Sequence, residues 1–192
     1  MWLFLTHYWV LLVLVPAVGV GAVTDITRGR IYNKLTYTTV VVALVGQSLF
    51  GGLWGGDGLS VGLVSALGGL ALGGGVLMLA VMAGGLHGGD VKLMAGVGAL
   101  LGWQVTLLAL TYTLVAAAVI SVVLILVRGV FWRTMRRLAG FFALLLTTRK
   151  PTDPATADSP RVPFGLAIAM GSLTAAVEVL WRGGWTLPGF RT

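Results

Sequence analysis

The sequence contains no cysteine and very little charge. Cysteine is absent from all 192 positions, which excludes disulfides, thiolate metal ligands and a cysteine nucleophile. The only two histidines, His7 and His87, lie far apart in sequence, so no cluster with zinc spacing exists and we expect no metal and no cofactor. Only 10% of the residues are charged, against about 25% in ordinary soluble domains. Most of the chain is therefore expected to face lipid.

What charge there is has one predominant sign. The net charge is +7 at pH 7. In a soluble protein this excess would raise the question of nucleic acid, but in a membrane protein it is typical of basic cytoplasmic loops. We therefore expect the lipid bilayer as a partner and no nucleic acid.

Long hydrophobic runs make up most of the chain, and 57% of its residues are hydrophobic. A spanning helix needs roughly 20 largely apolar residues. The pattern predicts an all-α, polytopic membrane helix bundle with about six transmembrane helices, in one domain over residues 1–192. The expected helices cover Trp2 to Val23, about Leu35 to Leu53, about Leu59 to Met82, about Val91 to Leu101, about Val105 to Val127 and about Phe164 to Trp181.

The fourth and fifth of these helices are separated by a break that we expect at Gly102 to Gln104. The fourth is too short to cross a bilayer alone, so its start should lie inside the protein. A glycine run from Gly68 to Gly75 falls within the third helix, where small residues allow helix backbones to approach closely.

A basic cytoplasmic loop is predicted over residues 128–162. Its first part, Phe131 to Leu146, mixes arginines with phenylalanines and leucines, as in a helix lying on an anionic membrane surface. With six spans both termini lie on one side, and placing them outside puts eleven Lys and Arg residues in cytoplasmic loops against two outside. The same orientation puts the loops around Asp25 and Asp90 on the cytoplasmic side.

The chain has only six acidic residues, and two of them stand out. Asp57, Asp153 and Asp158 fall in polar loops, and Glu178 is placed to pair with Arg182 four residues on. Asp25 and Asp90 instead lie at the cytoplasmic ends of apolar helices. Two carboxylates brought together near lipid share a proton, so one can activate a water molecule while the other polarises a peptide carbonyl. Alternatively, each aspartate only caps a helix.

Three segments carry a family resemblance. Asp25 followed by Ile31 and Asn33 resembles the D-x-x-x-x-x-I-x-N signature of type IV prepilin peptidases. Gly88-Gly89-Asp90-Val91-Lys92-Leu93 resembles their G-x-G-D-V-K-L segment, and Pro163-Phe164-Gly165 resembles the P-F-G that opens their last helix. The family's first motif glycine is His87 here, and two interpretations stay open: a tolerated loop residue, or a group that tunes the aspartate pair.

The resemblance implies an aspartic intramembrane endopeptidase with Asp25 and Asp90 as the catalytic pair. Such enzymes remove a short basic leader from prepilins, single-span proteins, at the cytoplasmic face of the prokaryotic inner membrane. Since the chain starts at its first span and lacks cysteine, it is similar to the small, peptidase-only type associated with Flp/Tad pili, and no methylation activity is expected. The oligomeric state is left open.

Two other classes of protein remain as alternatives. A small membrane transporter also uses intramembrane carboxylates, as relays, although this chain shows no internal repeat and both key acids lie at one membrane edge. A non-catalytic pilus or secretion assembly subunit would use the two aspartates only as caps.

Overall fold

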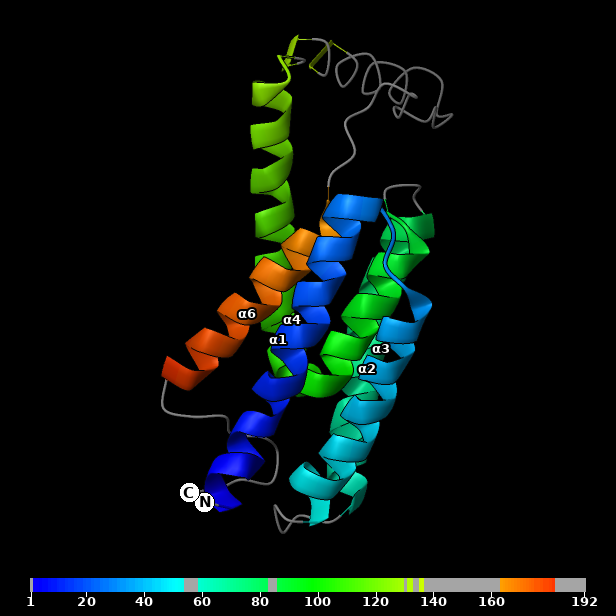
Figure 1. Ribbon diagram of the computed structural model, residues 1–192, viewed down its shortest axis with the longest axis vertical. Helices are drawn as coiled ribbons and strands as arrows, with labels where there is room; N and C mark the ends of the chain where they lie inside the picture. The colour runs from blue at the N-terminus through cyan, green and yellow to red at the C-terminus, as the bar shows by residue number, and fades with distance from the viewer. Residues whose placement is uncertain are drawn as a thin grey trace, which may run out of the picture. The chain divides into compact units, whose positions relative to one another are not determined.

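The computed structural model describes residues 2–53, 59–82, 86–129, 131–132, 135–136 and 163–181, and these are predominantly helical, with no strand in the described ranges. The prediction of an all-α fold is therefore confirmed. In chain order the elements are α1 (Trp2–Arg28), α2 (Asn33–Gly46), the π-helical segment η1 (Gln47–Leu53), α3 (Leu59–Met82), α4 (Gly88–Val127) and α6 (Phe164–Trp181), as Figure 1 shows.

Within the described part of the chain, four helices are long and apolar enough to cross a membrane, namely α1, α3, α4 and α6. The chain is therefore a multi-pass membrane protein. Helix α2 has only 14 residues and continues into the seven residues of η1. A total of about six spans needs this pair to cross once and α4 to cross twice, and it stays a prediction.

Helix α1 is longer than its apolar run predicted. The sequence placed the end of the span at Val23, whereas the helix continues to Arg28 and so includes Asp25 in its last turns. The stop is set by backbone geometry: Gly29 has a φ of 60° and its N–H donates to the carbonyl of Asp25 at 2.9 Å. This left-handed glycine is a common helix terminator. Helices α3 and α6 have the predicted bounds.

Helix α4 is interrupted at Gly102, as the sequence predicted for this region. Gly102 has a φ of 75° and a ψ of 165°, outside the helical range. Beyond it the hydroxyl of Thr106 reaches the carbonyl of Gly98 at 3.2 Å, although eight residues of straight helix would separate the two by about 12 Å. The chain therefore turns back on itself here (Figure 1). Gln47 donates to the carbonyl of Leu100 at 2.6 Å, which satisfies a group near the break.

The first part of α4, before Gly102, lies at the centre of the core. Leu93, Met94, Val97 and Leu100 are fully buried. Helix α3 approaches it so closely that a Cβ on Gly69 would lie 2.0 Å from the carbonyl oxygen of Gly98. The interpretation of the α3 glycine run as a helix-contact surface is thus confirmed at Gly69.

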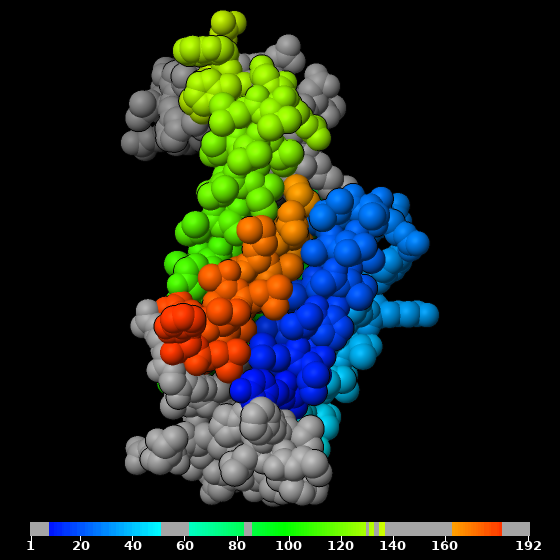
Figure 2. Space-filling view, turned by 60° about the vertical axis from the view of Figure 1, so that its left-hand side comes forward, coloured from blue at the N-terminus to red at the C-terminus, as the bar shows by residue number. Residues whose placement is uncertain are grey.

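Helix α1 divides into a buried stripe and a lipid-facing side. Val10, Leu14 and Val18 are fully buried at intervals of four residues, whereas Leu12 and Val15 are exposed, as expected for a helix between protein and bilayer. Helix α6 packs along α1, and Figure 2 shows the two side by side on one face.

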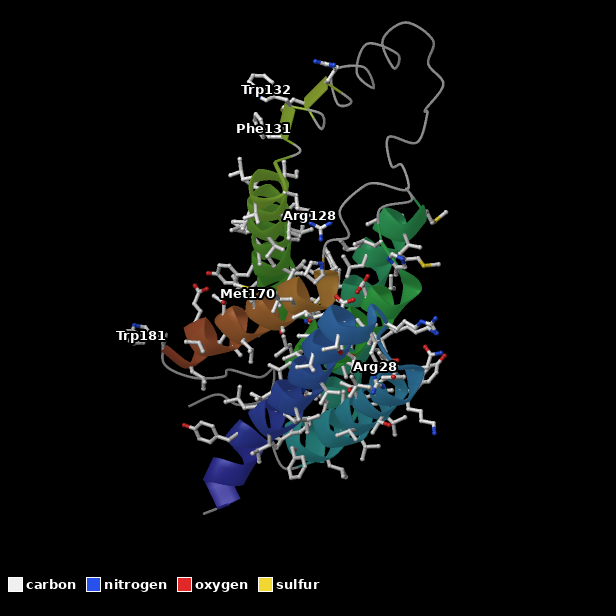
Figure 3. The ribbon with its side chains drawn as sticks, turned by 45° about the horizontal axis from the view of Figure 1, so that its top comes forward. Arg28, Arg128, Phe131, Trp132, Met170 and Trp181 are labelled. Atoms are coloured by element: carbon white, nitrogen blue, oxygen red, sulfur yellow. The ribbon has the colours of Figure 1, made fainter. Side chains whose placement is uncertain are left out.

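The chain forms two compact units, residues 1–116 with 163–192, and residues 117–162. In the second unit, the rings of Phe131 and Trp132 meet edge to face, with centroids 5.8 Å apart (Figure 3). The described residues 131, 132, 135 and 136 are helical and exposed. The rest of the predicted interfacial helix lies outside the described residues, and the single domain over residues 1–192 stays a prediction.

Candidate active site

The first candidate carboxylate, Asp25, is half-buried near the end of α1. One of its oxygens, Oδ2, accepts a hydrogen bond from the backbone N–H of Gly165 at 2.7 Å, across 140 positions of sequence. Gly165 is the second residue of α6, so Asp25 faces the N-terminus of that helix, where unpaired N–H groups and the helix dipole favour a negative charge. Helix α6 therefore supplies a charge-complementary contact for this carboxylate.

Gly165 is in close contact with Asp25. A Cβ placed on Gly165 would lie 2.9 Å from the Cβ of Asp25 and 3.0 Å from its Oδ2. Only glycine lets the amide approach the carboxylate this closely without displacing it. Phe164 beside it is 8% exposed, and the carbonyl of Pro163 accepts from Leu166 at 3.2 Å to open the helix. The Pro-Phe-Gly segment thus anchors α6 at this site.

The second candidate carboxylate, Asp90, is the third residue of α4 and only 5% exposed. Its Oδ2 accepts from the backbone N–H of His87 at 3.3 Å, and its own N–H donates to the carbonyl of His87 at 3.1 Å. This is one half of a capping box. Asp90 therefore caps α4, as one interpretation of the sequence expected. A catalytic role would be a second function of the same carboxylate.

Three contacts bring the segments of the two aspartates to the same end of the first unit (Figure 1). A Cβ on Gly21 would lie 2.8 Å from Leu93, and one on Gly89 would lie 3.3 Å from the Cβ of Ile31. From Gly21 to Ile31 the contacted position on α4 moves back from Leu93 to Gly89, so α1 and the first part of α4 run antiparallel. Asp25 lies about one turn beyond Gly21, and Asp90 about one turn before Leu93. The third contact is a hydrogen bond from Lys92 Nζ to Asn33 Oδ1 at 3.0 Å.

The predicted site residues thus fall into two groups. Ile31, Asn33, Gly89 and Lys92 make the contacts between the aspartate segments, and Pro163, Phe164 and Gly165 form the α6 start. Gly88 is exposed, with open space around its Cα, and the side chain of His87 is exposed. The side chain of His7 lies outside the described residues.

Glu178 has a partner that the sequence did not indicate, and its expected pairing with Arg182 stays a prediction. Tyr112 of α4 donates to its Oε2, while Arg182 lies outside the described residues. A tyrosine 66 positions away gives no helical spacing signal, so sequence reasoning could not have found this pair.

Tyr37 is a further residue that the sequence analysis missed. The Lys92 ammonium lies 5.3 Å from the centroid of its ring. Its spacing gave a clue, since Tyr37 follows Asn33 by four residues and so shares a helix face with it.

Three cationic residues follow Asp25 in the chain. Arg28, Arg30 and Lys34 are exposed at the end of α1 and the start of α2. Arg28, labelled in Figure 3, donates to the hydroxyl of Tyr32 and its guanidinium lies 5.5 Å from that ring's centroid. Among the described residues the only other acid is Glu178. Basic side chains therefore predominate in the segment that follows Asp25.

Hydroxyl groups close to Asp25 in sequence are engaged elsewhere. Thr24 donates to the carbonyl of Val20 at 2.8 Å, and Thr27 to that of Val23 at 2.7 Å. No group of three potential metal ligands occurs in the part of the chain that the structure describes. The chemistry that this arrangement offers is proton transfer by two carboxyl groups.

One prediction arises from the His87–Asp90 bond. His87 acts on Asp90 through its backbone N–H, so His87→Ala should leave peptide cleavage near the wild-type rate. His87→Pro removes the donor, and we expect cleavage to fall roughly tenfold to a hundredfold, because a reacting group that loses its positioning contact is misplaced. Cleavage rates of both purified variants measure this. Equal losses in both would show that the imidazole itself tunes the pair.

The fold and these contacts define a class, a helical multi-pass membrane protein in which two aspartate-bearing segments meet at one end of the first unit. The comparison with protein families is more specific. The model of the type IV leader peptidase family matches residues 12–122, more than half of the chain. The chain belongs to this family, and it is a peptidase of the leader-peptidase kind. No curated protein and no solved structure matches it.

The family match covers part of the candidate site. Asp25, Asp90 and the contact residues Ile31, Asn33 and Lys92 fall within residues 12–122, whereas Gly165 lies beyond them. The contact between Gly165 and Asp25 therefore comes from the structure alone.

Proposed function

We propose that the protein is an aspartic intramembrane endopeptidase in which Asp25 and Asp90 together activate a water molecule. The observation that carries this proposal is the convergence of the two aspartate segments through the Gly21–Leu93, Ile31–Gly89 and Asn33–Lys92 contacts. Membership of a peptidase family supports it. The sequence offers no cysteine as an alternative nucleophile.

The reaction follows from two carboxyl groups that share one proton. The ionised carboxylate takes a proton from water as the water attacks the peptide carbonyl, and the protonated carboxyl donates a hydrogen bond to the developing oxyanion. A proton then passes to the leaving amine, which completes hydrolysis. In this mechanism the N–H of Gly165 holds Asp25 in place, and the N–H of His87 holds Asp90.

The proposed substrate is a type IV, Flp-like prepilin, a single-span protein with a short basic leader. Arg28, Arg30 and Lys34 lie beside the candidate site, and an excess of basic residues is typical of the cytoplasmic side of a membrane. The proposal therefore places the site at the cytoplasmic face of the prokaryotic inner membrane, with both termini outside.

One observation favours a second candidate, a non-catalytic assembly subunit. Asp90 caps α4 through His87, and a cap alone requires no reaction. Asp90→Asn separates the two functions, because the amide oxygen can still accept the His87 N–H whereas the amide cannot exchange a proton with substrate. Assembly should survive this change and hydrolysis should not.

The position of the cut tests the proposal. The purified protein, incubated in EDTA with a prepilin from the same genome, should release a leader that ends in glycine, from a bond at the cytoplasmic edge of the substrate's span. Mass spectrometry of the product identifies that bond. A cut at mid-membrane depth, or activity restored only by added zinc, would contradict the proposal.

A further inference from the structure

Residues 29–33, the connection between α1 and α2 together with the first residue of α2, lie across the start of α4 and are here termed the strap. It begins where the N–H of Gly29 donates to the carbonyl of Asp25 at 2.9 Å. It then packs Ile31 against Gly89, the residue before Asp90. It ends at Asn33, which accepts from Lys92, two residues after Asp90. The strap therefore connects the backbone of Asp25 to residues that precede and follow Asp90 in sequence.

We propose that Lys92 is a positioning residue that closes this strap over α4 and so sets the placement of Asp90 relative to Asp25. The inference rests on the proposed function, because it assigns Lys92 a task in that same site. Lys92 acts through Asn33 and the strap and needs no contact with the substrate.

The location of Lys92 supports a positioning role. Its ammonium group lies near the starts of both α2 and α4, where the helix dipoles make a cation unfavourable. A residue placed against this local preference is typical of a functional site. Two contacts compensate for it, the hydrogen bond to Asn33 Oδ1 at 3.0 Å and the Tyr37 ring, whose centroid is 5.3 Å from Nζ.

The Lys92–Asn33 contact is expected to affect the catalytic rate more than the stability of the fold. The Lys92–Asn33 bond is exposed, and exposed polar pairs contribute little to folding. Catalysis by contrast depends steeply on geometry, since a misplacement of about 1 Å can lower a rate about a hundredfold. Breaking the bond should therefore affect turnover far more than thermal stability or substrate binding.

A double-mutant cycle tests the proposal. Lys92→Met and Asn33→Ala should each lower kcat about tenfold or more and leave KM nearly unchanged. The double variant should be no slower than the slower single variant, because both changes break one bond. Asn33→Asp, which retains an acceptor, should recover most of the rate. Lys34→Met removes the same charge from an exposed neighbour and is the matched control.

Hydrogen exchange gives a second readout that does not depend on activity. The segment of residues 29–37 should exchange faster in Lys92→Met than in wild type or Lys34→Met. Additive losses in the cycle, an equal loss in Lys34→Met, or unchanged exchange would each overturn the proposal. A wild-type protein that cleaves nothing would refute the proposed function instead, and the exchange data would still decide whether Lys92 closes the strap.

Discussion

Asp25→Asn and Asp90→Asn should each lower leader cleavage by roughly 10² to 10⁴, the usual contribution of a general acid or base. An amide supplies neither the ionised nor the protonated carboxyl that the reaction requires. Both amides retain an oxygen that can accept the structural hydrogen bond, from Gly165 in one case and from His87 in the other. Each variant should therefore still insert and accumulate in the membrane.

Accumulation and cleavage are measured in the same cells, by immunoblotting of the peptidase and of a tagged prepilin. Glu178→Gln is the control, since Glu178 lies outside the candidate site and accepts a hydrogen bond from Tyr112. We expect Glu178→Gln to process the prepilin. Wild-type processing by either aspartate variant would refute the assignment of the pair.

Gly165→Ala should lower cleavage about tenfold to a hundredfold, because it displaces Asp25. The new Cβ would lie 2.9 Å from the Cβ of Asp25, a distance that forces α6 or the carboxylate to shift by several tenths of an ångström. Rates depend steeply on displacements of this kind at a reacting group. The expected loss is in kcat, measured on the purified enzyme with the same prepilin.

Gly19→Ala provides the control for this change. Gly19 lies in α1, the helix that carries Asp25, six residues before it, but a Cβ there would have nothing within 4 Å. The control should keep its rate, and its thermal stability should match or exceed that of the wild type because alanine favours a helix over glycine. A Gly165→Ala enzyme with full activity would show that the close approach of Gly165 to Asp25 has no catalytic importance.

Hydropathy predicted those parts of the fold that depend on contact with lipid. The bounds of α3 and α6 follow directly from where their apolar runs stop. The end of α1 was predicted five residues too early, because Gly29 ends the helix by its backbone conformation, beyond the last apolar run. The break in α4 was predictable, since Gly102 precedes Trp103 and Gln104 within an otherwise apolar stretch. Nothing in the sequence indicated the π-helical segment η1.

The residues of the candidate site were singled out by their type, but their contacts could not be predicted. Asp25 and Asp90 stood out because carboxylates at membrane edges are scarce. The bond from Gly165 to Asp25 uses a backbone N–H across 140 positions. Almost every residue type has a backbone N–H, so the sequence does not indicate which one donates. The same holds for Asp90, whose partner is the backbone of His87. Lys92 and Asn33 matched motif positions, while their mutual bond required the folded chain.

The central claim, that Asp25 and Asp90 act as one catalytic pair, is tested most directly by comparing the two single Asn variants with the double variant. Single-turnover cleavage of the prepilin by excess purified enzyme gives the three rates. When two residues act in the same step, removing the second lowers the rate little once the first is gone. The double variant should therefore be no slower than the slower single variant. A double variant whose loss equals the product of the two single losses would contradict a shared mechanism.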